Sequence, residues 1–174
     1  MTTLSLAMIV KNEEQTLDRV LTDAKSFCDE LVVVDTGSTD RTIEIAQEHG
    51  AAIHHFEWVD DFSAARNFAF DQCQCDWIIW LDADDTIPSA EQQKIMTLKE
   101  RDLNESIDSV KATYHTVVRN GVPVNSKLRD RFVRRAAGLK WRRPVHEIIQ
   151  IDKTTNVLQR ADICIFHEPL KEKS

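Results

Sequence analysis

The sequence predicts an α/β fold in which a mostly parallel sheet is flanked by helices and followed by a β-richer C-terminal half. Three observations support this prediction. Nearly continuous apolar runs alternate with helical patterns over about the first 105 residues, as in sheets that helices cover on both faces. Acidic clusters follow two of these runs, at the strand ends where such sheets bind ligands. Beyond residue 105, strand-like segments are joined by loops.

The strands of the first half are short apolar runs, each followed by polar residues. The run Leu4–Val10 precedes the polar segment Lys11–Glu14, and another run ends abruptly at Asp35. Such runs are typical of strands that are buried on both faces. The predicted strands are Leu4–Val10, Leu31–Val34, Ala51–His55 and Trp77–Leu81.

The helices between these strands are predicted from apolar spacing and from end signals. Apolar residues recur at helical spacing from Leu17 to Ala24. Thr39 or Asp40 suits a helix cap, a glycine at residue 50 suits a helix end, and a proline at residue 88 suits a first turn. The predicted helices are Leu17–Ala24, residues 39 or 40 to Gly50, Phe62–Cys73, and Pro88 to about Arg101.

The second half is predicted to consist of strands and loops. Asn120-Gly121 is a strong hairpin signal between two of the expected strands. We therefore expect one domain over residues 1–174, with a first half of about 1–105 and a second half of about 106–174. The predicted strands are Val110–Val118, Leu128–Val133, Trp141–Ile151 and Val157–Phe166.

Composition and charge exclude several classes of protein. A hydrophobic content of 42% is enough for a folded core. No apolar run approaches the ~18 residues of a membrane span, and the N-terminus lacks the basic start and cleavage site of a signal peptide, so we expect a cytoplasmic location. The four cysteines are too few and too irregular for a disulfide scaffold. Cys73 and Cys75 lack the second pair that a zinc site needs.

The net charge of −7 is unevenly distributed along the chain. The stretch from Lys127 to Arg143 holds eight basic residues and one acid, Asp130. This stretch is either a solvated face or a strip that meets the phosphates of a donor or of a polyanionic acceptor. Nucleic acid is the least favoured partner, because no aromatic stacking platforms interleaved with base-reading residues are apparent.

The strongest chemical signal is the acidic cluster Asp82, Asp84 and Asp85, which directly follows the strand at Trp77. Carboxylates this close together repel one another and raise one another's pKa. A divalent cation removes that repulsion, and carboxylate oxygens suit Mg²⁺ or Mn²⁺. The alternative is an acidic turn that caps the following helix.

A second signal is the segment Asp35-Thr36-Gly37-Ser38, at the end of another predicted strand. Gly37 allows a tight turn, and the amides and hydroxyls near a helix start can receive polar ligand groups. The Asp35 carboxylate can accept a hydrogen bond from a nucleotide base or ribose. An ordinary capped turn between strand and helix is the alternative.

Two further features are an arginine on an apolar helix face and a His-Glu pair. Arg66 shares the face of Ala65 and Ala69, so its buried guanidinium needs an anion, either a diphosphate or one of the carboxylates. His146 and Glu147 follow an aromatic and basic loop and could supply a metal ligand and a general base. A structural ion pair and a structural histidine are the alternatives.

Taken together, these stretches resemble the inverting family-two glycosyltransferases of the GT-A fold, which have a Rossmann-like nucleotide-binding sheet. The matching motifs occur in the family's order over roughly residues 4 to 90, and a fifth stretch matches less specifically. The motifs are AMIVKNEE (7–14), VVVDTGSTDRT (32–42), WVDDFSAARN (58–67) and WIIWLDADD (77–85), with WRRPVHE (141–147) as the fifth.

The resemblance implies a site for a nucleotide-diphospho-sugar, with a UDP-sugar as the default donor. Asp35 would contact the base, and the Arg66 side chain would face the diphosphate or the sugar. The backbone around Met8 to Val10 would lie beside the base, and the remaining donor-binding positions implied by the motifs are Lys11, Gly37 and Asp82.

The resemblance also implies a divalent metal, Mn²⁺ or Mg²⁺, and direct displacement at the anomeric carbon with inversion. Asp84 would bind the metal, with Asp82 and His146 near it. Glu147 is the expected base, and Asp85 stands where the family often has glutamate. The acceptor would be a carbohydrate, a lipid-linked molecule or a macromolecule, and a homo-oligomer or a partner protein would complete its site.

Parts of the sequence also fit four other interpretations. Residues 82–86, Asp-Ala-Asp-Asp-Thr, also fit the nucleophile motif of haloacid-dehalogenase-like phosphatases, but no later acidic motif follows. Asp35-Thr36-Gly37 mimics the loop of retroviral-type aspartic proteases, but helices flank it. A nucleotidyltransferase would need a triphosphate loop rich in glycine and arginine near the first strand, and none is present. The fourth interpretation is a non-catalytic module that binds nucleotide sugars.

Overall fold

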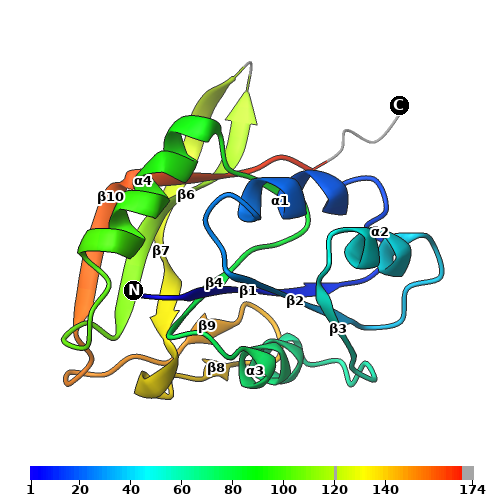
Figure 1. The fold of residues 1–174 in the computed structure, drawn as a ribbon, viewed down its shortest axis with the longest axis horizontal. Coiled ribbons are helices and arrows are strands. Elements are labelled where there is room, and N and C mark those ends of the chain that lie inside the picture. The colour runs from blue at the N-terminus through cyan, green and yellow to red at the C-terminus, as the bar shows by residue number, and fades with distance from the viewer. Residues whose placement is uncertain (120, 170–174) are drawn as a thin grey trace.

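A central sheet of eight strands runs through the molecule, in the order β3-β2-β1-β4-β7-β6-β10-β5 (Figure 1). The computed structural model describes residues 1–119 and 121–169. Strands β3, β2, β1 and β4 are parallel neighbours, as their continuous apolar runs predict. Their bounds are β1 Leu4–Val10, β2 Glu30–Asp35, β3 Ala52–His55 and β4 Trp77–Trp80.

Helices cover both faces of this sheet and enclose two apolar cores (Figure 1). Side chains of α1, α2 and α4 pack in one core, and those of α3 pack in the other. Because successive side chains of a strand point to opposite faces, Leu6 and Met8 of β1 enter the first core and Ala7 enters the second. The bounds are α1 Leu17–Ala24, α2 Thr42–Glu48, α3 Phe62–Gln72 and α4 Ser89–Arg101.

The four predicted helices are confirmed, with one shifted start. Helix α2 begins at Thr42, because the Asp40 carboxylate accepts hydrogen bonds from the backbone N–H and the hydroxyl of Thr42 and holds the preceding residues in a turn. Within residues 1–119 and 121–169, no helix is long and apolar enough to cross a membrane.

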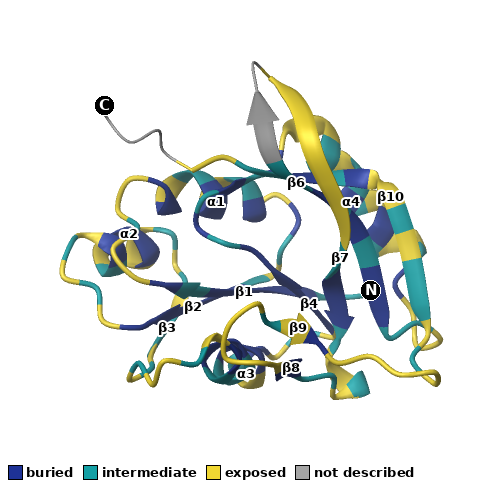
Figure 2. Ribbon diagram, turned by 180° about the vertical axis from the view of Figure 1, so that it is seen from behind, coloured by how far each residue is buried: buried dark blue, intermediate teal, exposed yellow. Residues whose placement is uncertain are grey.

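The C-terminal half is β-rich, as predicted. Strands β6 and β7 form an antiparallel hairpin in which Arg119 pairs with Val122. Gly121 adopts φ +76° in the turn, and the other predicted turn residue, Asn120, lies outside the described residues. Strand β7 begins well before the predicted Leu128. The sequence did not predict its first half, because that half is exposed and lacks an apolar pattern (Figure 2). The bounds are β6 Ser109–Arg119, β7 Val122–Arg134 and β10 Val157–His167.

The predicted strand Trp141–Ile151 is wrong. Two short strands, β8 (Trp141–Arg142) and β9 (Ile148–Ile149), pair with each other, and a loop joins them. Arg143 and His146 in this loop have positive φ angles of 80° and 55°, which extended strands do not contain. The structure also has a short strand that the sequence did not predict, β5 (Asp85–Thr86), which pairs with the end of β10.

The basic stretch from Lys127 to Arg143 does not form one continuous strip. Arg131 is fully buried, whereas Arg134 pairs with Asp108 and Lys140 pairs with Asp71. Alternating positions of β7 point to opposite faces of the sheet, so neighbouring charges in the sequence are separated in space.

Candidate active site

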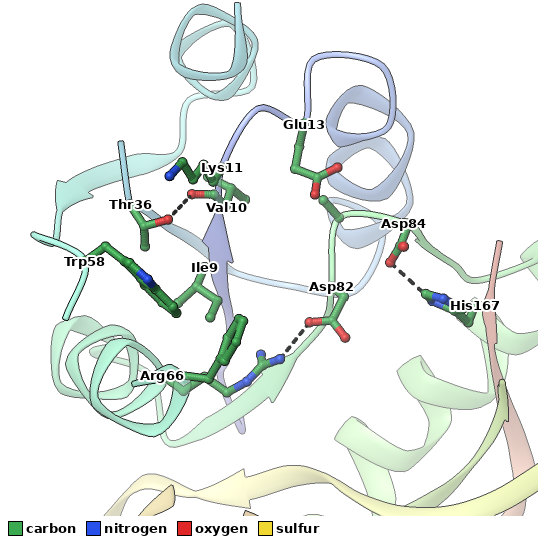
Figure 3. A pocket seen from close by; sticks show the side chains of 12 residues that line it. Ile9, Val10, Lys11, Glu13, Thr36, Trp58, Arg66, Asp82, Asp84 and His167 are labelled. Atoms are coloured by element: carbon green, nitrogen blue, oxygen red, sulfur yellow. Dashed lines mark hydrogen bonds and ion pairs between the residues drawn. The ribbon is translucent and has the colours of Figure 1, made fainter. Parts of the chain in front are cut away.

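A cleft of about 450 Å³ opens where β1, β2 and β4 end (Figure 3). These strands are parallel, so the residues that follow each of them meet at the same edge of the sheet. The cleft has an apolar side at β1 and α3 and an acidic side after β4. Its lining residues are Ile9, Val10, Lys11, Glu13, Thr36, Trp58, Phe62, Arg66, Asp82, Ala83, Asp84 and His167.

The acidic side of the cleft pairs Asp84 with a histidine from the far end of the chain. The Nδ1 atom of His167, the last residue of β10, lies 3.3 Å from Oδ1 of Asp84. Strand β5 brings the two residues together, since Asp85 pairs with His167 in the sheet and the Glu168 N–H donates to the Asp84 carbonyl at 2.9 Å.

This corner of the cleft fits a divalent cation. Asp84, Asp85 and His167 each offer one ligand atom, and these atoms all lie within 4.8 Å of one another. The His167 Nδ1 atom is buried and makes no hydrogen bond within the described residues. An imidazole nitrogen that lies within ion-pair distance of a carboxylate but makes no hydrogen bond to it is part of a donor set that suits a cation.

Arg66 occupies the opposite wall, where helix α3 places it. The Asp61 carboxylate caps this helix by accepting from the Ala64 N–H at 3.1 Å. The Arg66 guanidinium donates to Asp82 and to Glu147, both at 2.8 Å, and its side chain is 8% exposed. Its central carbon lies over two indole rings, 4.7 Å from Trp80 and 5.0 Å from Trp141. The inward direction predicted from the helical wheel is therefore observed.

The charges of this wall perturb one another. Burial opposes ionisation of both partners, but their attraction outweighs it. The pKa of the Asp82 carboxyl falls below its usual value beside Arg66 and Arg131, and the pKa of the Arg66 guanidinium rises. Asp82 therefore carries its charge at the edge of the cleft, where a bound anion would compete with it for Arg66.

The Asp35 side chain bonds to the backbone of the turn that follows β2. The Asp35 carboxylate accepts from the backbone N–H groups of Gly37 and Ser38 at 3.0 to 3.2 Å, and it is 4% exposed. Gly37 has φ +110°, a backbone conformation that favours glycine. Thr36, rather than Asp35 or Gly37, lines the cleft, and its hydroxyl donates to the Val10 carbonyl at 3.0 Å.

The expected donor-binding residues at the end of β1 divide between core and cleft. Met8 is fully buried in the core below the sheet edge, so its side chain does not reach the cleft. Val10 and Lys11 line the cleft, and Lys11 is exposed. A contact between residue 8 and the donor, if it forms, therefore involves the backbone of Met8, as predicted, and not its side chain.

The β8–β9 loop places the His-Glu pair in two environments. Glu147 contacts Arg66 and lines a second cavity of about 160 Å³, together with Arg129 and Ile148 among others. His146 is exposed, and it belongs neither to the cleft lining nor to the group of metal-ligating side chains within the described ranges. His167, and not His146, lines the cleft beside Asp84, and the role of His146 as a metal ligand stays a prediction.

Asp85 is buried behind the cleft rather than within it. Its side chain is 0% exposed, and burial raises the pKa of its carboxyl even though the Arg131 guanidinium lies beside it. Its catalytic role stays a prediction, but its position favours contacts within the protein over contacts with a substrate.

Among the cleft residues that the sequence did not predict as site residues, Glu13, Trp58 and His167 bear most on its chemistry. Glu13 lines it from the loop after β1, and burial together with Asp84 and Asp82 raises the pKa of its carboxyl. Trp58 covers the apolar side (Figure 3), where its indole N–H donates to Asp60 at 2.9 Å. The signal for His167 was present in the sequence, as a second His-Glu dipeptide at the end of a predicted strand.

Comparison with known sequences gives a family and a longer relative. Residues 5–146 match the model of Glycosyl transferase family 2. The chain is 39% identical over 166 residues to a TPR repeat-containing protein of Synechococcus elongatus. This match covers 93% of this chain and 38% of that protein.

Solved structures share the fold at low sequence identity. The S. aureus TarS 1-349 structure in complex with UDP-GlcNAc gives a TM-score of 0.71 at 17% identity, covering 98% of this chain and 60% of that one. Glucosyl-3-phosphoglycerate synthase from Mycobacterium tuberculosis, in complex with Mn²⁺, UDP and phosphoglyceric acid, gives 0.52 at 23% identity, covering 65% and 43%. The chain spans less than two thirds of the length of these structures and of the Synechococcus protein.

Proposed function

Because the chain belongs to glycosyl transferase family 2 and has the GT-A fold, we propose that it transfers a sugar from a nucleotide-diphospho-sugar, by default a UDP-sugar, with inversion at the anomeric carbon. The observation that carries this proposal is that Asp82, Asp84, His167 and Arg66 face one cleft from three different segments, the loop after β4, the end of β10 and helix α3. A cleft with paired carboxylates, a cation position and a guanidinium suits a diphosphate.

The two sides of the cleft suggest how the donor lies. The diphosphate belongs at the acidic corner near Asp84, within reach of Arg66. The nucleobase belongs on the apolar side, where Ile9 offers aliphatic surface and Trp58 a flat indole ring beside the Thr36 turn. This orientation is supported by the order of the residues along the cleft in Figure 3.

Asp84 and His167 would hold the divalent metal, Mn²⁺ or Mg²⁺, and Asp82 lies at the same edge. The metal would supply positive charge to the oxygens of the leaving diphosphate. The Nδ1 atom of His167 supports this assignment, because it is buried beside the Asp84 carboxylate and makes no hydrogen bond among the described residues. The structure of the Mycobacterium tuberculosis synthase holds Mn²⁺ together with UDP.

Transfer needs charge neutralisation on one side of the sugar and a base on the other. The acceptor nucleophile attacks the anomeric carbon, the bond from that carbon to the diphosphate oxygen breaks, and the electron pair leaves with the nucleoside diphosphate. Arg66 stabilises the developing charge by exchanging its present carboxylate partners for the diphosphate. Glu147, released on the side of the second cavity, takes the proton of the acceptor.

Asp84→Ala should abolish metal-dependent turnover of the donor. The assay follows release of nucleoside diphosphate from UDP-sugars with Mn²⁺ present, first without an acceptor. Asp71→Ala is the matched control, because Asp71 is an exposed acid paired with Lys140 away from the cleft. If Asp84→Ala turns over the donor at the wild-type rate, the proposal is contradicted.

A non-catalytic module that binds nucleotide sugars is the second candidate. The observation that favours it is that the chain spans 38% of its Synechococcus relative, so most of that protein lies outside the matched region. Such a module would bind UDP with Mn²⁺ and release no nucleotide from the donor. The acceptor, a partner protein that completes its site and the cytoplasmic location stay predictions.

A further inference from the structure

A buried network of charged and aromatic side chains lies behind the acidic loop of the cleft. Arg131 of β7 and Asp85 of β5 are both 0% exposed and form an ion pair at 3.1 Å. Tyr114 of β6, 7% exposed, donates from its hydroxyl to Oδ1 of Asp85 at 2.8 Å. None of these three side chains lines the cleft.

The Arg131 guanidinium contacts two aromatic rings, but only one of its three nitrogens makes hydrogen bonds within the described residues. Its central carbon lies 3.8 Å from the centre of the Trp80 ring and 4.1 Å from that of Tyr114. One nitrogen, Nη1, donates to Asp85 and to the Trp80 carbonyl, both at 3.1 Å. The other two, Nε and Nη2, are buried with no hydrogen-bond partner among the described residues. Buried donors without partners oppose folding, and apolar side chains in place of the whole Arg131–Asp85 pair would avoid that cost, so stability alone does not account for the pair.

Asp85 links this network to the cleft. Its Oδ2 atom accepts from Arg131 and also from the backbone N–H of Asp82 at 3.0 Å. The carbonyl of Asp82 in turn accepts from the backbone N–H of Asp85 at 3.0 Å. The loop is therefore closed by two bonds between its first and last residues, and Asp84 lies inside that closed loop.

We propose that Arg131 is a positioning residue, which acts through Asp85 to hold the loop that presents Asp84 to His167. The inference rests on the proposed function, because it concerns the cation that Asp84 and His167 would hold. Tyr114 contributes from the opposite carboxylate oxygen. Arg131 itself touches neither the cation nor the donor.

Positioning and simple electrostatics predict opposite effects. If Arg131 acted through its charge alone, its removal would strengthen cation binding, since one positive charge near the site would be lost. If Arg131 positions the loop, its removal weakens cation binding. Partners that orient metal ligands typically contribute about 10- to 100-fold to metal affinity.

The test is a Mn²⁺ titration followed by electron paramagnetic resonance, with UDP affinity measured in parallel. Arg131→Lys keeps the charge but cannot stack a planar group between the rings of Trp80 and Tyr114. We expect it to weaken Mn²⁺ binding about tenfold. Tyr114→Phe removes one bond to Asp85 and should weaken Mn²⁺ binding about two- to tenfold, the effect of one hydrogen bond.

The control is Arg134→Lys on the same strand, because Arg134 pairs with Asp108 and is remote from the acidic loop. It should change Mn²⁺ affinity less than about twofold, even if it lowers the melting temperature. Mn²⁺ affinity of Arg131→Lys within twofold of the wild type overturns the inference. If Arg131→Lys does not fold, Tyr114→Phe decides alone, and unchanged Mn²⁺ affinity there overturns it. Absence of Mn²⁺ binding in the wild type would instead reject the proposed function.

Discussion

At the residue scale, one arginine in the wall of the cleft forms ion pairs with two carboxylates. Arg66 bonds to Asp82 on the donor side and to Glu147 on the side of the second cavity. A guanidinium can do this because its donors point in several fixed directions within one plane. The indole rings beneath it keep that plane in place.

Arg66→Lys should lower kcat/KM for donor turnover by at least about tenfold. The lysine ammonium keeps the charge, but it cannot bond both carboxylates or stack on the rings, so the leaving diphosphate loses an oriented donor. Steady-state kinetics with a UDP-sugar and Mn²⁺ measure the change. Arg135→Lys is the control, since Arg135 is exposed and bonds to the Cys75 carbonyl far from the cleft. Equal kinetics for the two variants would contradict the role of Arg66.

Glu13→Gln should stabilise the metal-free protein at neutral pH. Burial and the nearby charges of Asp84 and Asp82 raise the pKa of Glu13 in the folded state, so ionisation opposes folding above that pKa. Glutamine carries no charge, and its amide oxygen can still accept from the Thr16 hydroxyl, which lies 2.8 Å from the carboxylate.

The gain in free energy of unfolding should be complete near pH 7 and decrease as the pH falls through the raised pKa. It should vanish below the ordinary pKa of a glutamate, about 4.3, where both states are protonated. Denaturant unfolding in EDTA at several pH values measures it, with exposed Glu57→Gln as the control. A gain that does not depend on pH would show that burial of charge is not its cause.

At the element scale, the sequence predicts strands and helices well where burial is complete. Strands β1 and β4 are apolar at almost every position, and helix α3 has a clear cap and apolar face. Strand β7 begins earlier than predicted because its exposed half carries no apolar signal. The β8–β9 loop was predicted as a strand because positive φ angles at Arg143 and His146 have no signature in residue type.

The candidate site follows the same division. Asp82, Asp84 and Arg66 were found because their positions follow from local periodicity and strand ends. His167 and Arg131 lie on strands β10 and β7, and their approach to β4 and β5 depends on the order of strands in the sheet. Strand order is a property of the whole chain, so no local pattern contains it.

Helix α3 should depend on its cap. Asp61→Ala should lower the free energy of unfolding by about 1 kcal/mol, the usual contribution of an N-cap side chain. Asp61→Asn should lose less than half of that, because the amide oxygen can still accept from the Ala64 N–H. Urea unfolding compares the two variants. Equal losses in both would mean that the carboxylate charge, rather than the cap, stabilises the helix.

At the scale of the whole molecule, the parallel order β3-β2-β1-β4 collects polar residues at one edge, and β10 adds a histidine to them. The hairpin of β6 and β7 supports this edge from behind through Tyr114 and Arg131. Residues separated by more than 80 positions in the chain therefore meet at one loop, as the pairing of Asp85 with His167 illustrates.

The central claim is that a cation held at Asp84 and His167 binds the diphosphate of the donor. Isothermal titration of UDP into the wild-type protein, with Mn²⁺ and then with EDTA, tests it most directly. We expect UDP to bind at least about tenfold more tightly with Mn²⁺, and His167→Ala to lose most of that difference. Equal UDP affinity with and without the metal would contradict the claim.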